Sequence, residues 1–373
     1  MTTEPVTWTR EDHTAAKHDL LRAFFVKWVS IHSGYFTQAR GGLVRIYDGF
    51  AGPGVYSGGE PGSPRILLEE LLDNPNLLDR WATVRYEFTF VEQDVRRARM
   101  LDGILRDIER DRRADGAWTD QIRWSVTAGR YEEHTPTRVA ERNSALFLFL
   151  DPFGYSQAPM TLTTKLVQQP KSDTLIFLPL SFVHRFASRE GQDQALDRFF
   201  GIPAWRDVPN GLDRPQALLE LFQQQLRAAG LEYTLPFCLK PPDRRNEYWV
   251  VGASGHPRGF ASIKEGYWAV DPTDGYGFAA PKPTPAGQGA LFGDLPTTGP
   301  NTAPLLAELR ARFGNDWFTV EEAIALTGRS RFLDSHLKER TLAPAEKAGA
   351  LEVDRSGGGR RFKEGSGTKM RFV

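Results

Sequence analysis

The sequence predicts an α/β protein whose main domain is a doubly wound, Rossmann-like sheet with an antiparallel edge hairpin, followed by a winged helix-turn-helix domain. Three observations support this prediction. An apolar strand runs into a glycine-rich turn and a helix start within residues 43–72. Further apolar strands alternate with helical patterns, which assigns residues 1–270 to the sheet domain. Residues 271–300, rich in Pro, Gly, Thr and Ala, read as a linker to residues 301–373.

Composition limits the classes of protein that the chain can belong to. Its 373 residues are enough for two or three domains, and 47 basic and 47 acidic side chains give a formal net charge of zero. Binding of nucleic acid would therefore depend on local patches. The single cysteine, Cys238, excludes an internal disulfide framework and is typical of a reducing cytoplasm. No apolar run approaches the length of a membrane span, so we expect a soluble cytoplasmic protein without a membrane partner.

Hydrophobic periodicity predicts the elements of the first domain. Residues 1–9 are expected to form a loose tail, and the helix that follows has an apolar face repeating every three or four residues. The predicted helices are 10–32, 64–78, 95–110, one near 181–200, 214–229 and 258–269, and the predicted strands are 43–48, 86–91, 122–127, 145–150 and 174–178, with a hairpin of 233–240 and 247–253. The alternation predicts a parallel sheet with an antiparallel edge.

The turn after the first strand holds Asp48 and three glycines, Gly49, Gly52 and Gly54. Glycine lets a backbone approach a ligand without a Cβ in the way. The spacing is not G-x-G-x-x-G, and the Lys-Ser/Thr pair of a phosphate loop is absent, which disfavours a pyrophosphate cradle. The loop therefore favours a ligand with an amino-acid or adenosine part. The alternative is an ordinary turn that binds no ligand.

Polar or glycine residues end four successive strands, at Asp48, Glu92, Gly129 and Asp151. Because ligands of open α/β sheets bind outside the carboxyl ends of the strands, these positions predict a small-molecule site. A carboxylate at Glu92 suits the hydroxyls of a ribose, since it accepts two hydrogen bonds. The alternative is an acid that only stabilises the start of helix 95–110.

The residue types at this site narrow the chemistry. The seven histidines form no H-E-x-x-H or Cys/His pattern, and no G-x-S-x-G turn is present, so we expect neither a metal site nor an esterase. S-adenosylmethionine fits the loop better than NAD does. The carboxylate of Asp151 and the carbonyl of Pro152 are placed to hold an exocyclic amino group, and Phe153 or Tyr155 to stack on a base.

The last domain combines a predicted helix-turn-helix with a ribbon of strands. Helices are expected over 303–313, around 319–326 and over 330–342, and the glycine-rich tip at 357–359 joins two short strands. Residues 355–373 carry six basic side chains and one acid, Glu364, and the candidates for phosphate contact are Arg355, Arg360, Arg361 and Lys363. A winged helix that contacts protein instead stays open.

Four segments together carry a resemblance to a known family. They are His-Thr-Ala-Ala-Lys-His at 13–18, Tyr-Asp-Gly-Phe-Ala-Gly-Pro-Gly at 47–54, Gly-Ser-Pro at 62–64 and Asp-Pro-Phe-Gly at 151–154. Over nearly its whole length the chain resembles the three-Cys-motif partner family (TcmP-type proteins), which implies a methyltransferase-like domain with a C-terminal winged helix. More distantly, it is similar to the large-subunit ribosomal RNA adenine-N6 methyltransferases.

The resemblance implies roles for individual residues. It makes Asp151 catalytic and places at the cofactor Lys17, His18, Phe50, Ser63, Glu92 and Gly129. Without the resemblance, a second interpretation has equal weight: Lys17 is a solvated lysine and His18 a half-buried histidine, with no role in binding. The family's name implies a partner protein with a Cys motif. Two positions depart from the pattern: the acid expected before Gly129 is Ala128, and the Asp-Pro turn continues with Phe153 and Gly154.

The main hypothesis is therefore an S-adenosylmethionine-dependent methyltransferase that acts on nucleic acid at a base amino group, with Asp151, Pro152 and Phe153 at the reacting centre. The alternative is a non-catalytic, methyltransferase-like partner or regulatory module that binds DNA or a protein through its winged helix, which Ala128 favours. A nicotinamide-dependent oxidoreductase is the third interpretation.

Overall fold

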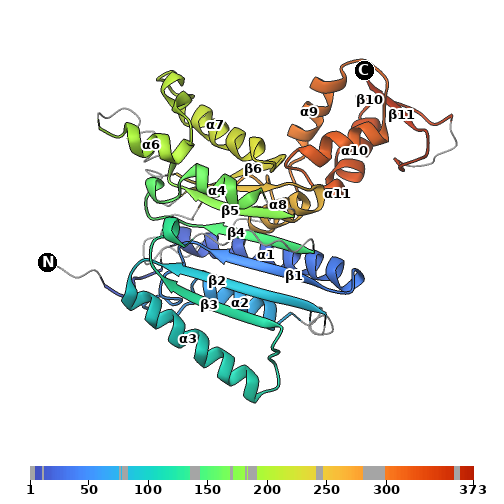
Figure 1. Ribbon diagram of the computed structural model, residues 1–373. Coiled ribbons are helices and arrows are strands. Elements are labelled where there is room, and N and C mark those ends of the chain that lie inside the picture. The colour runs from blue at the N-terminus through green and yellow to red at the C-terminus, as the bar shows by residue number, and fades with distance from the viewer. Residues whose placement is uncertain are drawn as a thin grey trace, which may run out of the picture. The chain divides into compact units, whose positions relative to one another are not determined.

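Figure 1 shows the chain as a computed structural model, which describes residues 5–10, 12–74, 77, 83–134, 143–168, 171–180, 183, 191–240, 247–279, 299–356 and 362–373. The chain divides into two compact units, Met1–Gly266 with Phe278–Lys282 and Tyr267–Gly277 with Pro283–Val373. The first unit contains a large mixed sheet, and the second contains helices and a small sheet.

Among the described residues, the large sheet has eight strands in the order β3-β2-β1-β4-β5-β7-β6-β8. Their bounds are Gly42–Asp48 (β1), Val84–Glu92 (β2), Ile122–Ala128 (β3), Ser144–Leu150 (β4), Ser172–Leu178 (β5), Tyr233–Lys240 (β6), Tyr248–Ser254 (β7) and Gly277–Ala279 (β8). The first five pair in parallel, whereas β7 is antiparallel to both β5 and β6. This is the arrangement of a Rossmann-like methyltransferase sheet, which confirms the predicted fold class.

The apolar runs of the sequence become the centre of the sheet. Every residue of β4 and β5 is buried, as in a strand covered on both faces. Strand β1 is buried from Leu43 onwards and pairs with β2 on one side and β4 on the other. The strand order therefore reverses at β1, and the carboxyl end of β1 is the position where such sheets bind ligands.

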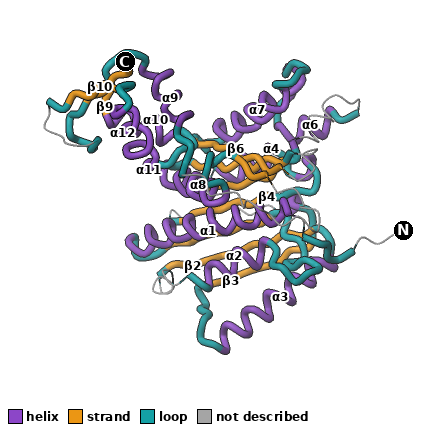
Figure 2. Tube along the Cα trace, turned by 180° about the vertical axis from the view of Figure 1, so that it is seen from behind, coloured by secondary structure: helices purple, strands orange, loops and turns teal. Residues whose placement is uncertain are grey.

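Helices cover the sheet on both faces (Figures 1 and 2). The helices described in the first unit are Asp12–Gln38 (α1), Ser63–Leu72 (α2), Val95–Ala114 (α3), Met160–Val167 (α4), Asp193–Phe200 (α6) and Arg214–Ala228 (α7). Helix Pro257–Val270 (α8) begins in the first unit, which ends at Gly266 within this helix. Short 3-10 turns lie at Tyr131–Glu133 (η2), Tyr155–Gln157 (η3) and Pro203–Asp207 (η4). Helix α1 packs against α2, and α4 packs against α6 and α7. Helix α3 runs along β3 at the edge of the sheet.

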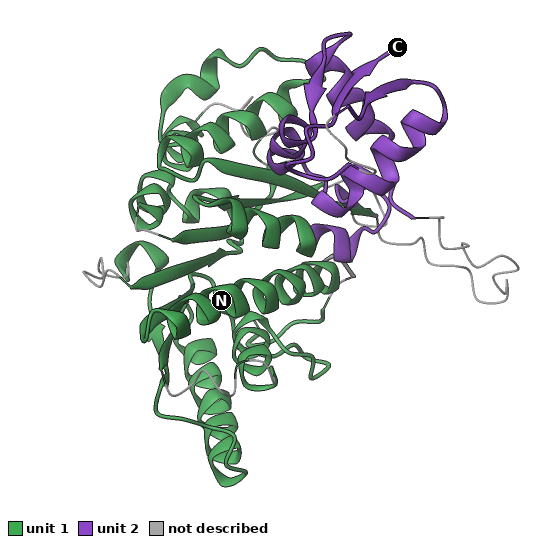
Figure 3. Ribbon diagram, turned by 90° about the vertical axis from the view of Figure 1, so that its right-hand side faces the viewer, with its two compact units in different colours: residues 1–266, 278–282 green, residues 267–277, 283–373 purple. Residues whose placement is uncertain are grey.

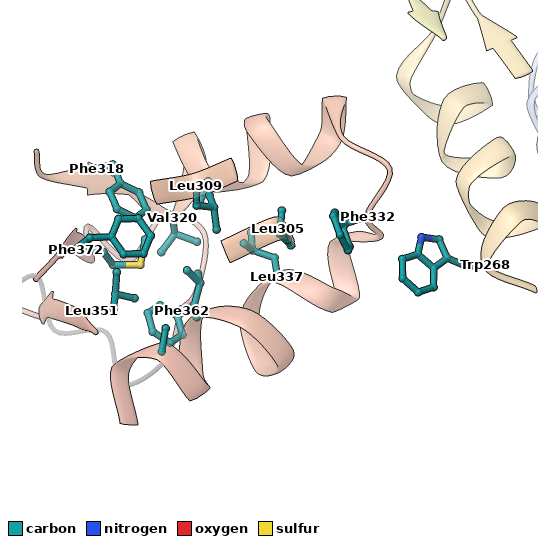
Figure 4. Packing of buried hydrophobic residues seen from close by; sticks show 14 residues of the cluster. Trp268, Leu305, Leu309, Phe318, Val320, Phe332, Leu337, Leu351, Phe362 and Phe372 are labelled. Atoms are coloured by element: carbon teal, nitrogen blue, oxygen red, sulfur yellow. The ribbon is translucent and has the colours of Figure 1, made fainter. Parts of the chain in front are cut away.

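The second unit, purple in Figure 3, has its own core. Its helices are Ala303–Phe313 (α9), Val320–Arg329 (α10), Asp334–Leu337 (α11) and Ala343–Lys347 (α12), with a π-helical turn at Lys338–Leu342 (η5). Strands Phe318–Thr319 (β9), Leu351–Asp354 (β10) and Lys369–Phe372 (β11) pair in the order β10-β11-β9. Figure 4 shows the buried cluster of Leu, Val and aromatic side chains between them. A C-terminal region of helices and sheet is therefore present, and its assignment as a winged helix stays a prediction.

Two predictions about local structure need correction or restriction. The helix predicted over 330–342 begins later, at Asp334, because a turn in which the Ser330 hydroxyl accepts from the Phe332 amide (3.2 Å) precedes it. From Asp334 the helical segment continues through the π turn η5 into α12. The predicted linker holds strand β8, where four backbone N–H groups donate to the Asp271 carboxylate. The rest of that linker, residues 280–298, lies outside the described residues. Within the described ranges, no helix has the length and apolar character of a membrane span.

Candidate active site

Four adjacent strand ends form one rim of the large sheet. Strands β3, β2, β1 and β4 are neighbours in this order, so the residues at or just after their carboxyl ends lie side by side. These residues are Gly129, Glu92, Asp48 and Asp151. The rim therefore brings together the ends that the sequence singled out, and the local structure determines what each side chain does.

Two pockets of about 700 Å³ and 770 Å³ adjoin at the rim. Of the predicted site residues, the first pocket is lined by Lys17, His18, Gly52, Gly54, Ser63, Asp151 and Pro152, the second is lined by Gly49, Glu92 and Gly129, and both are lined by Phe50 and Phe153. Pockets of this size accept a ligand as large as a nucleoside. Asp48 lines neither pocket.

Asp48 lies beneath the glycine-rich loop and holds both of its ends. Its Oδ1 accepts a hydrogen bond from the Phe50 amide (3.0 Å), and its Oδ2 accepts one from the Ser63 hydroxyl (2.7 Å). The pKa of Asp48 is raised to about 7, mainly by its complete burial. The two hydrogen bonds oppose this rise, and the charges of Asp151 and Glu92 contribute to it. The predicted direct contact between Asp48 and a cofactor is replaced by a positioning role, because the side chain is wholly covered.

Glu92 holds the middle of the same loop. Its Oε2 accepts a hydrogen bond from the Gly52 amide (2.9 Å), and its Oε1 accepts one from the Asp94 amide (2.7 Å). Burial raises the pKa of Glu92, opposed by these bonds and by the charge of Arg97. The N-cap of α3 is Asp94, whose side chain accepts from the Arg96 amide, so Glu92 is not the capping acid of that helix. The carboxylate still faces the second pocket.

Two glycines at the rim are required by their neighbours. A Cβ on Gly49 would lie 2.7 Å from Cδ2 of Leu150 and 2.7 Å from Cδ2 of Tyr131. A Cβ on Gly129 would lie 2.0 Å from Nε2 of His134. Real Cβ atoms do not approach other heavy atoms this closely, so a side chain at either position would displace its neighbours. Gly129 also has φ +157°, which side chains rarely adopt. Each still presents its backbone to the second pocket.

Lys17 and Asp151 form an ion pair at the first pocket. Nζ of Lys17 lies 2.8 Å from Oδ1 and 3.1 Å from Oδ2 of Asp151. The same ammonium lies 4.8 Å from the centre of the Phe177 ring and 5.4 Å from that of Tyr248. Sequence reasoning placed Lys17 at the cofactor and missed both rings, because β5 and β7 carry no motif. Lys17 is thus directed at the predicted catalytic carboxylate rather than at open pocket space.

His18 lies beside Lys17 in α1 and also lines the first pocket. Its Nε2 lies 3.5 Å from the Tyr56 hydroxyl, and its buried Nδ1 has no hydrogen-bond partner among the described residues. Burial lowers the pKa of His18 to about 4, so the imidazole is neutral near pH 7. A neutral imidazole carries one donor nitrogen and one acceptor nitrogen, and here Nδ1 is covered by the protein.

The loose tail predicted over residues 1–9 is wrong for residues 5–9, which contact the rim. Trp8 lines both pockets, and its ring contacts that of Phe153 edge to face at 5.5 Å. The Arg97 guanidinium lies 4.5 Å from the Trp8 ring centre. Sequence reasoning missed Trp8 because an isolated tryptophan in a polar segment has no periodicity, and its partners come from α3 and from the turn after β4.

The turn after β4 presents an aromatic side chain to solvent. Pro152 is buried, whereas Phe153 is 69% exposed. The hydroxyl of Tyr155 donates to Oε1 of Gln192 (2.7 Å), which holds η3 next to the start of α6. Phe153 is therefore the aromatic group of this turn that is available to a planar ligand. The described residues contain no group of three or more His, Cys, Asp or Glu side chains arranged to hold a metal.

The basic residues predicted in the second unit have different surroundings. Arg355 makes a bidentate ion pair with Glu346 (2.5 and 2.7 Å), which raises the pKa of the guanidinium. The pair with an acid on α12 already neutralises this guanidinium, and its phosphate contact stays a prediction. Lys363 is exposed, whereas Arg360 and Arg361 lie outside the described residues.

Fold and rim together define the class of this protein as a Rossmann-like α/β protein with a methyltransferase-like sheet. No protein-family model and no curated protein matches the chain. Among solved structures, it is similar to protein LPL1258 from Legionella pneumophila, described under DUF519, with 10% identity over 66% of this chain and 89% of the other at a TM-score of 0.38. YjhP from E. coli matches with 10% identity over 62% and 98% at 0.24. The plantazolicin methyltransferase BpumL, solved with SAH, matches with 10% identity over 65% and 89% at 0.25. Similarities this distant carry no argument about activity, and the fold assignment rests on the strand order.

Proposed function

We propose that the protein is an S-adenosylmethionine-dependent methyltransferase whose acceptor is an amino group of a nucleic-acid base. The observation that carries the proposal is the rim itself. Two adjoining pockets lie at the reversal point of the strand order, with the loop held by Asp48 and Glu92 between them. In open α/β sheets this position binds nucleotide-like ligands.

Two features of the rim fit S-adenosylmethionine. A Cβ on Gly52, which has φ +65°, would meet only Cη2 of Trp8, at 4.0 Å, so the loop leaves space for a ligand to approach its backbone. The imidazole of His18 lines the first pocket and is neutral near pH 7, so it offers a polar but uncharged side chain to a ligand there. Glu92 would hold the ribose hydroxyls, and His18 and Ser63 would hold the amino-acid part. When bound, the cofactor supplies an electrophilic methyl group on a sulfonium.

Asp151 and Pro152 would orient the acceptor. The Asp151 carboxylate accepts hydrogen bonds from an amino group, and Lys17 fixes the direction of that carboxylate from the other side. The exposed ring of Phe153 offers a face on which a base stacks. Alignment of this kind is the main contribution that a protein makes to methyl transfer.

Two observations support nucleic acid as the substrate. The hydrogen-bond acceptors of Asp151 and Pro152 and the ring of Phe153 suit a base, and the second unit carries basic side chains. Lys363 is exposed, and Arg360 and Arg361 are its neighbours in the sequence. Phosphate contacts by such residues depend strongly on salt. The same residues would serve the second candidate function, a non-catalytic partner module, which Ala128 favours because the rim lacks an acid at that position.

The proposal is tested in two stages with the full chain. Calorimetry with S-adenosylhomocysteine tests the cofactor site, and no binding at millimolar ligand contradicts it. Transfer of labelled methyl groups to purified RNA and DNA tests the activity, with Asp151→Asn as the variant and Asp115→Asn, at the far end of α3, as the control. A partner module would bind nucleic acid equally well with and without the Asp151 carboxylate and would transfer no label.

A further inference from the structure

Residues 5–10 form a strap across the rim that we name the N-terminal strap. Polar contacts join it to the glycine-rich loop and to α3. The Trp8 carbonyl accepts a hydrogen bond from the Ser57 amide (3.0 Å), and the Pro5 carbonyl accepts one from Nη2 of Arg97 (2.9 Å). Arg10 adds an ion pair with Glu60 at 3.9 Å. The strap thus joins the glycine-rich loop on one side to α3 on the other.

The Trp8 indole lies at the boundary between the two pockets. It lines both of them, together with Phe50 and Phe153. Its ring stands edge to face against Tyr56 (6.3 Å) on the side of the first pocket and against Phe153 (5.5 Å). The Arg97 guanidinium lies over it from the second pocket, at 4.5 Å. A ligand that fills both pockets therefore has to pass next to this indole.

The contacts that hold the strap are few and half exposed. Its residues have no regular secondary structure, and the side chains of Trp8 and Arg10 are half-buried rather than buried. Segments with such contacts open at a small fraction of the free energy of global unfolding. A ligand beneath the strap would add contacts with Trp8, so closing and ligand binding would stabilise each other.

We propose that Trp8 is a ligand-binding residue that closes over a nucleoside-type ligand spanning the two pockets, and that opening of the N-terminal strap controls the release of that ligand. The inference rests on the proposed function for the nature of the ligand. Arg97 acts on the ligand through Trp8 and is a positioning residue. The Trp8 indole contributes a flat apolar surface, and its removal leaves the polar contacts at Glu92 and His18 in place.

The test measures binding and release of S-adenosylhomocysteine by the full chain. We expect Trp8→Ala to raise the dissociation rate constant about tenfold, the size of one lost cation–π and ring contact. Arg97→Lys keeps the positive charge, loses the planar stacking group, and should raise the rate by a smaller factor. Trp317→Ala is the matched control, because Trp317 also lies under an arginine, Arg371 at 4.9 Å, in the other unit. It should leave both rates unchanged.

Hydrogen exchange gives a second readout that does not depend on the dissociation rate. The Ser57 amide is protected only while the strap is closed, so the ligand should slow its exchange, and Trp8→Ala should abolish that slowing. Equal dissociation rates for the wild type and Trp8→Ala, with Ser57 exchange that the ligand does not change, would contradict the role of the strap and leave the proposed function intact. Absence of binding by the wild type overturns the proposed function and the strap with it.

Discussion

Nζ of Lys17 lies 2.8 Å from Oδ1 of Asp151, across 134 positions of sequence. The lysine side chain is 11% exposed and the aspartate side chain 31%, so the pair is only partly shielded from water. Lys17 comes from the first helix, and Asp151 follows the central strand β4. This ion pair connects the helix before the sheet to the turn that we propose as the reacting centre, and it gives the first of four predictions.

Replacing Lys17 by Met should lower methyl transfer by at least about tenfold and the unfolding free energy by about 1–2 kcal/mol. The loss follows because Asp151 stays partly buried without its cation and is free to change its orientation. Steady-state transfer of labelled methyl groups and urea unfolding measure the two effects. Lys27→Met is the control, because Lys27 lies on the same helix as Lys17 and forms an exposed pair with Glu265 of α8 (3.2 Å). This substitution should change stability by less than about 1 kcal/mol. Similar effects of the two substitutions would rule out a special role for Lys17.

Removing the Glu92 carboxylate should weaken binding of S-adenosylhomocysteine by about 1–3 kcal/mol. The variant Glu92→Ala leaves the Gly52 and Asp94 amides without their acceptor, so both the loop and the proposed ribose contact are lost. Calorimetry of the folded variant measures the change in affinity. Glu87→Ala, on the same strand, controls for the loss of an acid from β2. An unchanged affinity for Glu92→Ala would remove Glu92 from the ligand site.

The sheet was predictable because its signals are local. The continuous apolar run of β4 predicts a buried strand, and the acid that ends β1 marks the end of its strand; both signals lie within a few residues of sequence. The role of Asp48 was not predictable, since only the fold brings Ser63 and Phe50 to its two oxygens. Trp8 and the Arg355–Glu346 pair were missed for the same reason: their meaning depends on partners that no spacing rule connects.

Asp48 should make stability depend on pH in a direction opposite to that of an ordinary aspartate. Its pKa of about 7 in the folded protein exceeds the ordinary value of 3.8, so the folded state binds the extra proton between these values. The contribution is therefore complete below pH 4 and is lost as the pH rises through 7. We expect the unfolding free energy of the wild type, relative to Asp48→Asn, to fall by roughly 2–4 kcal/mol between pH 4 and pH 8. Parallel pH profiles in urea unfolding would show that Asp48 is ionised throughout.

Substituting Ala for Gly49 should destabilise the protein by about 1–3 kcal/mol, because a Cβ there would displace Leu150 or Tyr131. Tyr131 lies 5.4 Å from Phe50, ring centre to ring centre, so the displacement would also reach the wall shared by the two pockets. Thermal and urea unfolding measure the stability, and calorimetry measures ligand affinity.

The matched control is Gly103→Ala in the exposed middle of α3, where an added Cβ meets no heavy atom within 4 Å. Alanine has the higher helix propensity, so this variant should gain up to about 1 kcal/mol. The two glycines thus predict opposite signs for the same chemical change. Equal and small effects would mean that Gly49 has room for a methyl group and that the close packing of Tyr131 over the end of β1 is wrong. A large loss at Gly49 with unaltered ligand affinity would instead separate the packing of this rim from its binding function.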